Sequence, residues 1–116
     1  VTYGMGVYWS KDAMKNLLNY SADIIDLRTL QPWDKEAVRK SVEKTNKIIV
    51  VHEDSITGGI GAEISAWVTE NCFSHLDGPV MRVGGLDTPI PFRKELEENF
   101  MPVGRIEEKI NSLLKY

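Results

Sequence analysis

Residues 50–64 read VVHEDSITGGIGAEI and hold the side chains best suited to chemistry. An apolar run ends in His52, Glu53 and Asp54, a glycine cluster follows, and a helical pattern begins behind it. An imidazole beside carboxylates can transfer protons, and glycines ahead of a helix can cradle a phosphate. The same outline also fits an ordinary corner between a strand and a helix.

The glycine cluster does not match a nucleotide-binding fingerprint. Gly58, Gly59 and Gly61 read G-G-x-G and follow His52 after five residues, whereas a dinucleotide site needs G-x-G-x-x-G directly after a strand. Carboxylates nearby, among them Glu63, would repel a phosphate. Because glycines also let a helix start close against a sheet or another subunit, we interpret the cluster as a structural corner or an interface.

His52 is predicted to lie at the carboxyl end of a central strand, where open α/β sheets bind ligands. A YGMG turn at 3–6 would face it. His52 could transfer a proton or hold a loop by hydrogen bonds, and no nucleophile or second base is placed beside it. Trp33 follows a proline at another corner, where exposed aromatic side chains often mark contacts. We therefore predict no catalytic, cofactor-binding or metal-binding residue, and one candidate set for a crevice or interface. That set is Tyr3, Gly4, Trp33, His52, Glu53, Thr57, Gly58 and Gly59.

The composition narrows the class of protein. A length of 116 residues suits one domain, and 42% apolar with 27% charged residues suits a globular chain. The net charge of -3 argues against nucleic acid or an anionic membrane as a partner. The two histidines and the single cysteine, Cys72, show no spacing typical of a metal site. Cys72 follows an apolar helical pattern, which predicts a buried thiol.

Apolar segments of strand length alternate with helical patterns along the chain. Ser10, Asp34 and Thr57 are predicted to cap the first three helices. Segment 47–51, KIIVV, is apolar at every position after Lys47, which is typical of a parallel strand buried on both faces. The predicted strands are 1–7, 23–28, 47–51 and 79–83, and the predicted helices cover 11–20, follow Asp34 and Thr57, and cover 92–99 and 105–115. The alternation predicts one three-layer α/β/α domain over 1–116, with a mainly parallel sheet of about four strands in the order 2-1-3-4.

Three stretches together resemble a known family. They are DIIDLRTLQPWDKEAVRKSVEKTNKIIVVHED (23–54), TGGIGAEI (57–64) and RVGGLDTPIPF (82–92). They are similar to the carboxy-terminal domain of the beta subunit of 2-oxo acid dehydrogenase complexes, in the thiamine-diphosphate-dependent decarboxylase component. The likeness covers nearly the whole chain from Val1 to Pro102 and favours the branched-chain 2-oxoisovalerate type over the pyruvate type. The same domain type closes transketolase.

The resemblance implies an α/β domain that holds no cofactor itself. In this family, thiamine diphosphate and magnesium lie between an alpha-subunit domain and the preceding beta-subunit domain, and their G-D-G…N motif is absent here. The implied role is pairing of the alpha and beta subunits and docking of the acyltransferase's subunit-binding domain, in the cytoplasm or the mitochondrial matrix. The parent would decarboxylate a branched-chain 2-oxo acid and transfer the acyl group to lipoyl, whereas the isolated domain would be inactive.

The chain also departs from the family. It begins at Val1 inside a strand-like segment, so we expect a fragment of a longer protein. Family members usually have an additional antiparallel strand just before this position, and without it one sheet edge is expected to be uncovered. Two alternatives stay open. One is the same domain from a pyruvate or acetoin dehydrogenase, and the other is a stand-alone nucleotide- or anion-binding module that uses the YGMG and HEDSITGG corners.

Overall fold

All residues from 1 to 116 are described in the computed structural model, which contains five α-helices, one short 3-10 helix and two strands. Along the chain they are α1 (Gly6–Lys15), α2 (Lys35–Thr45), β1 (Ile49–Ser55), α3 (Ile60–Cys72), η1 (Phe73–His75), β2 (Met81–Gly85), α4 (Lys94–Phe100) and α5 (Val103–Leu113). None of the helices is both long and apolar enough to cross a membrane.

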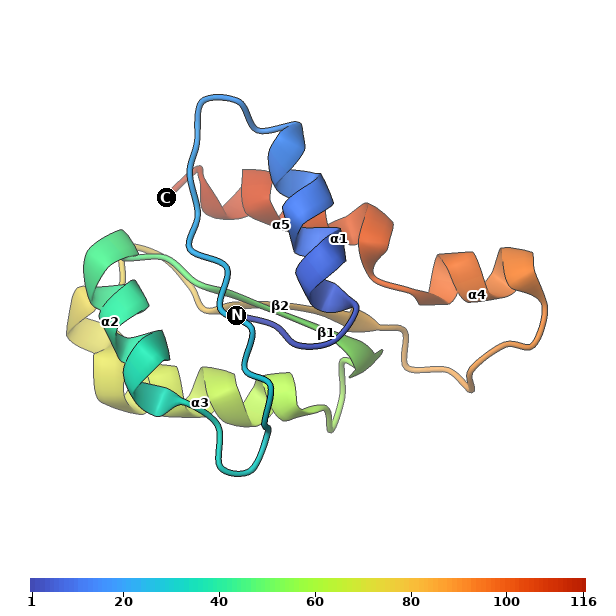
Figure 1. Ribbon diagram of the computed structural model, residues 1–116, viewed down its shortest axis with the longest axis horizontal. Helices are drawn as coiled ribbons and strands as arrows, with labels where there is room; N and C mark the ends of the chain where they lie inside the picture. The colour runs from blue at the N-terminus through green and yellow to red at the C-terminus, as the bar shows by residue number, and fades with distance from the viewer.

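The elements form three layers around a parallel pair of strands. Ile49 of β1 lies opposite Met81 of β2, and α3 is the crossover between the strands. Helices α2 and α3 cover one face of the sheet and α1 and α5 the other, whereas α4 projects from one end of the molecule (Figure 1). The α/β class and the layering agree with the sequence prediction, but the sheet has two continuous strands instead of four.

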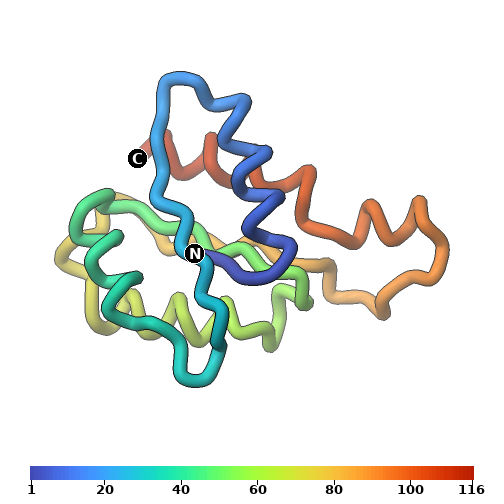
Figure 2. The backbone as a smooth tube through the Cα atoms, in the orientation of Figure 1, coloured from blue at the N-terminus to red at the C-terminus, as the bar shows by residue number.

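The predicted strand at 1–7 is wrong, because the chain turns into α1 at Gly6. Gly4 adopts a left-handed φ of 56°, and Gly6 packs so closely on Thr2 that a side chain would collide with it. Only Thr2 pairs like a strand residue, through isolated parallel bridges to Asp26 and Val51. The predicted strand at 23–28 runs beside the amino terminus (Figure 2) but forms no continuous strand.

The first half of strand β1 is buried on both faces, as the apolar run at its start predicts. Val50 packs with Ile64 and Val68 of α3 in the larger core cluster. Val51 packs with Ile106 of α5 in the smaller cluster on the opposite face. The prediction of a buried strand at 47–51 is thus confirmed for 49–51, whereas the strand begins two residues later than predicted and continues through Ser55.

The helix starts show which sequence signals were reliable. Asp34 caps α2 as predicted, since its Oδ1 accepts a hydrogen bond of 2.9 Å from the Ala37 N–H. Ser10 is not a cap, because α1 begins before it. Thr57 is not a cap either: Gly59 precedes α3, and the Thr57 hydroxyl instead donates to the distant Asp87.

Candidate functional site

His52 lies inside the molecule and not at its surface. Its side chain is completely buried on the α3 face of β1, and its Nδ1 lies 3.0 Å from the Asp54 carbonyl oxygen. Because a carbonyl only accepts, Nδ1 is the protonated nitrogen, and Nε2 is left without a partner. Burial lowers the pKa of the imidazole, although the Asp54 carbonyl acts in the opposite direction. The ring is therefore neutral and fixed in one tautomer.

Three glycines enclose the imidazole, and we call Gly59, Gly61 and Gly84 the glycine box. A Cβ atom on Gly59 would lie 2.8 Å from His52 Cε1, and one on Gly84 would lie 2.7 Å from the same atom. A Cβ on Gly61 would collide with Nε2. These positions require glycine because the backbone touches the ring. The cluster after β1 therefore serves close packing, as the structural-corner interpretation proposes.

Outside the box, hydrogen bonds join the β1–α3 loop to the loop after β2. The N–H and Oγ1 of Thr57 donate to the two carboxylate oxygens of Asp87 at 2.9 and 2.7 Å. These two hydrogen bonds lower the pKa of the Asp87 carboxyl. Arg82 Nη1 donates to the Ile56 carbonyl at 2.9 Å. The loop around 55–58 is thus held against the start of the next loop.

The structure does not bring the predicted set together in one crevice. His52 and Gly59 are buried in the box, whereas Tyr3 is half-buried and lines a separate hollow next to α1. Burial raises the pKa of the Tyr3 hydroxyl, and the charges of the acids after His52 add to this. The members left exposed are Gly4, Glu53, Thr57 and Gly58.

Trp33 is buried, with 8% of its surface exposed, and is not the exposed aromatic expected at this corner. Its ring meets Trp67 of α3 edge-on, with ring centroids 5.0 Å apart. Lys35 and Arg39 lie over the two indoles, with charged groups 5.3 to 5.8 Å from the ring centroids. Trp33 therefore packs α2 against α3.

The corner does not fit a diphosphate group. The imidazole already fills the space between the glycines, and Glu53, Asp54 and Asp87 place negative charge around it. No three His, Cys, Asp or Glu side chains come close enough together to hold a metal ion. The arrangement can position backbone and loops, and it offers no proton-transfer group to a substrate.

Sequence reasoning missed an exposed apolar segment, which we call the apolar arm (residues 86–96). Phe92 is fully exposed, Ile90 is 67% exposed and Leu96 is 53% exposed. The arm leads into α4, which stands apart from the three layers (Figure 1). So many large apolar side chains in one short segment are typical of a contact surface. The signal was present in the TPIPF sequence, where apolar residues alternate with prolines in a loop.

Comparisons with known proteins agree with this fold. Residues 1–105 match the family described as transketolase, C-terminal domain. A solved structure described as "Split gene transketolase, inactive beta4 tetramer" superposes with a TM-score of 0.78 over 98% of this chain and 38% of that chain, at 21% sequence identity. At this identity the likeness concerns the fold alone.

Relatives in sequence include beta subunits of two types of dehydrogenase. The chain is 48% identical over 97 residues to the mitochondrial 2-oxoisovalerate dehydrogenase subunit beta 2 of Arabidopsis thaliana, covering 83% of this chain and 26% of that protein. It is 42% identical over 105 residues to the mitochondrial pyruvate dehydrogenase E1 component subunit beta of Caenorhabditis elegans, covering 88% and 30%. The chain thus spans less than a third of the length of these relatives. On the family match over 1–105, this chain belongs to the transketolase C-terminal domain family.

Proposed function

We propose that the chain is the carboxy-terminal domain of the beta subunit of a thiamine-diphosphate-dependent 2-oxo acid dehydrogenase, of the branched-chain type. The observation that carries the proposal is the 48% identity to a 2-oxoisovalerate dehydrogenase beta subunit over 83% of the chain. The parent would decarboxylate a branched-chain 2-oxo acid and pass the acyl group to lipoyl, in the cytoplasm or the mitochondrial matrix. Thiamine diphosphate and magnesium would bind outside this domain.

The domain's own task would be assembly. The first two residues of the apolar arm are anchored: Asp87 is held by Thr57, and the Leu86 N–H donates at 3.3 Å to the carbonyl of Phe100, the last residue of α4. Arg105 of α5 adds hydrogen bonds to the carbonyls of Gly84 and Phe100, at 2.8 and 3.1 Å. An exposed segment that is fixed at its base makes a surface that needs less ordering when a partner subunit binds. The glycine box would fix the backbone just before this surface, because one of its members, Gly84, lies two residues ahead of the arm.

The test is calorimetric titration of the chain with the alpha subunit of a branched-chain 2-oxo acid dehydrogenase and, separately, with the subunit-binding domain of its acyltransferase. Binding of either partner is expected, and Phe92→Asp should weaken it at least tenfold. The control is Leu18→Asp, since Leu18 is 90% exposed but lies beyond the end of α1 and outside the arm. Binding of neither partner, or equal loss in both variants, would overturn the assembly role.

We also propose that four parallel strands in the order 2-1-3-4 form in the longer protein. Thr2 supports this order, since its parallel bridges place segment 23–28 on one side of it and β1 on the other. The strands that are continuous here, β1 and β2, would be the third and fourth.

Two other functions remain as competing proposals. The 42% identity to a pyruvate dehydrogenase beta subunit supports the same role in a pyruvate or acetoin enzyme, and titration with the corresponding alpha subunits separates these. A nucleotide-binding module is the alternative from another class, and the imidazole that fills the space between the glycines counts against it. It predicts that nucleotides raise the melting temperature in proportion to the logarithm of their concentration.

A further inference from the structure

An open hollow of about 890 Å³ lies beside the first turns of α1, and its lining comes from residues 3–11 and from residues 24–30. Thr2 pairs in parallel with Asp26 on one side and with Val51 on the other, so the hollow follows the carboxyl ends of two neighbouring extended segments. The first segment leads into α1 on one face of the sheet, and the second leads into α2 on the opposite face (Figure 1). In α/β folds, crevices that bind ligands form where neighbouring parallel segments continue to opposite faces.

Aromatic and aliphatic side chains make up much of the lining. Tyr3 is half-buried, whereas Met5 is 50% exposed and Tyr8 is 62% exposed. Ile24 and Leu30 add half-buried aliphatic surface. With its pKa raised, the Tyr3 hydroxyl stays protonated and can donate a hydrogen bond. The hollow therefore offers an apolar body of a ligand a surface with a polar group at its edge.

Two cations in the lining have donors that the chain itself does not use. Arg28 Nε donates to Asp26 Oδ2, but neither Nη group of this guanidinium makes a hydrogen bond within the chain. Lys11 forms no ion pair. The hollow thus holds two positive groups against one carboxylate, although the whole chain carries a net charge of -3. A local excess of positive charge attracts an anion, and the guanidinium edge matches the two oxygens of a carboxylate.

Both segments that line the hollow contain a residue in the left-handed backbone conformation. Gly4 has a φ of 56° and Arg28 has a φ of 60°. A Cβ on Gly4 would meet no atom within 4 Å, so a ligand can approach the backbone closely there. For an arginine this conformation is unfavourable, and such strain is concentrated at functional sites. At Arg28 it turns the chain so that the guanidinium reaches back to Asp26, two residues earlier.

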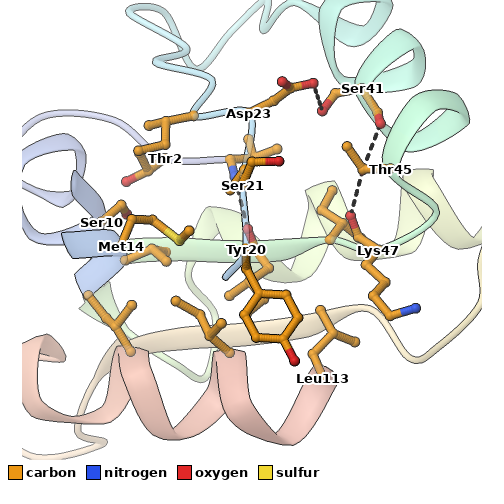
Figure 3. Close-up of a pocket in the computed structure, with 18 of the residues that line it drawn as sticks. Thr2, Ser10, Met14, Tyr20, Ser21, Asp23, Ser41, Thr45, Lys47 and Leu113 are labelled. Carbon is orange, nitrogen blue, oxygen red and sulfur yellow. Dashed lines mark hydrogen bonds between the residues drawn. The ribbon is translucent and has the colours of Figure 1, made fainter. Parts of the chain in front are cut away.

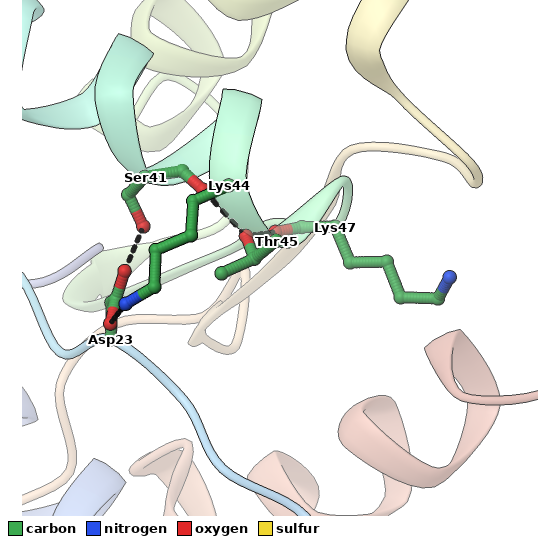
Figure 4. Close-up of polar contacts among 5 residues, drawn as sticks. All are labelled: Asp23, Ser41, Lys44, Thr45 and Lys47. Carbon is green, nitrogen blue, oxygen red and sulfur yellow. Dashed lines mark hydrogen bonds and ion pairs between the residues drawn. The ribbon is translucent and has the colours of Figure 1, made fainter.

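Polar contacts with α2 fix the segment that carries Ile24 and Asp26. Asp23 accepts a hydrogen bond of 3.2 Å from Ser41 and forms an ion pair of 2.8 Å with Lys44 (Figure 4). The same segment also borders a separate cavity of about 260 Å³ between α2 and α5 (Figure 3), so that Ile24 lines both. Because this wall is already fixed, a ligand in the hollow would have little chain to order.

We propose that this hollow binds a small organic carboxylate with an apolar or aromatic body. The body would pack on Tyr3, Met5 and Tyr8. The carboxylate would face the Lys11 ammonium and the free edge of the Arg28 guanidinium. The proposal does not rest on the proposed function, because the hollow shares no residue with the apolar arm.

Size and charge limit the class of ligand. The volume lies within the range of small-molecule sites, about 300–1,000 Å³. Asp26 stands in the lining, and the charges of Asp54 and Glu53 already act on Tyr3. These carboxylates would repel the additional charges of a diphosphate or triphosphate, whereas a single negative charge is balanced by the positive excess.

The test is a titration of the isotope-labelled chain with phenylacetate, followed by two-dimensional NMR up to about 20 mM, since ligands with few atoms bind weakly. The control ligand is phenylacetamide, which has the same ring but no charge. We expect saturating amide shifts at Gly4 and Tyr8 with phenylacetate, and roughly fivefold weaker binding of the amide. Lys11→Gln should weaken phenylacetate binding roughly threefold. Lys15→Gln should not, because Lys15 lies on the same helix but pairs with Asp12 outside the hollow.

Shifts that do not saturate, or equal affinity for the two ligands, would overturn the proposal. So would equal weakening in the two lysine variants, because the loss would then come from the charge of the helix and not from the hollow. Saturating shifts confined to the apolar arm would place the ligand elsewhere and would also contradict it. Shifts at Gly4 that depend on protein concentration before ligand is added would mean that a second copy fills the hollow, which is equally contrary. None of these results alters the titration with the alpha subunit, so the two proposals fail separately.

Discussion

Replacing Gly84 by alanine tests the glycine box most directly. The new Cβ would lie 2.7 Å from His52 Cε1 and 2.9 Å from the Asp54 carbonyl oxygen. Carbon atoms in contact prefer about 3.5–4.0 Å, so roughly 1 Å of space is missing. The ring cannot move away, because Gly59 and Gly61 touch its other sides and Nδ1 is bonded to the Asp54 carbonyl.

The magnitude follows from two opposing effects. Overpacking of this kind costs about 1–3 kcal/mol, while alanine lowers the entropy of the unfolded chain and returns about 0.4–1 kcal/mol. We therefore expect Gly84→Ala to lower the free energy of unfolding by about 1–2 kcal/mol. For a domain of this size the melting temperature should fall by roughly 4–10 °C.

The assay is urea unfolding followed by circular dichroism, with thermal melting beside it. The control is Gly104→Ala in α5, where a Cβ would meet no atom within 4 Å. Alanine favours a helix over glycine, so this variant should gain up to about 1 kcal/mol. The cycle is completed with His52→Ala, in whose background Gly84→Ala should cost clearly less, because only the contact with the Asp54 carbonyl oxygen remains. If Gly84→Ala lowers the free energy of unfolding equally with and without the His52 ring, or does not lower it in either background, the glycine box is not the reason for glycine at this position.

Stability should fall as the pH falls from 8 to 6, by about 2 kcal/mol, because the buried Val1 amine takes up its proton more readily in the unfolded chain. The lowered pKa of His52 acts in the same direction below its ordinary 6.5, and urea midpoints at pH 8.5, 7 and 5.5 measure the sum. A urea midpoint that rises as the pH falls would contradict the effects expected of the Val1 amine and of His52. Asp87→Ala should lower the melting temperature by removing both acceptors of the Thr57 bonds, whereas Asp77→Ala, whose carboxylate makes no bond, should not change it. Trp33→Ala should cost about 3–5 kcal/mol, and a loss below 1 kcal/mol in urea titration would mean that its edge-on packing matters little.

Local signals predicted the elements that depend on local causes. Segment KIIVV contributes a buried strand because the four residues after Lys47 are all apolar, and Asp34 caps α2 because its acceptor reaches an N–H three residues on. The helix predicted over 105–115 is likewise present as α5, with Ile106 and Leu113 buried. In each case the residues that decide the outcome are neighbours in sequence.

The sequence predictions were wrong where the role of a residue depends on a partner far away in the sequence. Thr57 has the right type for a helix cap, but Asp87 in the loop after β2 takes its hydroxyl proton. Trp33 stands beside a proline and a charged helix, and only the position of Trp67 makes it a core residue. His52 was predicted to lie in a crevice at the end of a central strand, yet it is enclosed in the glycine box, which is completed by Gly84 of another strand.

The position of Thr2 between Asp26 and Val51 also has a consequence during synthesis. Its bridging partners lie downstream in the chain, and β1 in turn pairs with β2, which is made later still. At ribosomal speeds of about 5–20 residues per second, the wait for Val51 alone is roughly 3–10 s. During that time the apolar amino-terminal segment has no sheet to join and is open to chaperones. The residues that leave the ribosome first in this domain are thus among the last to reach their native partners.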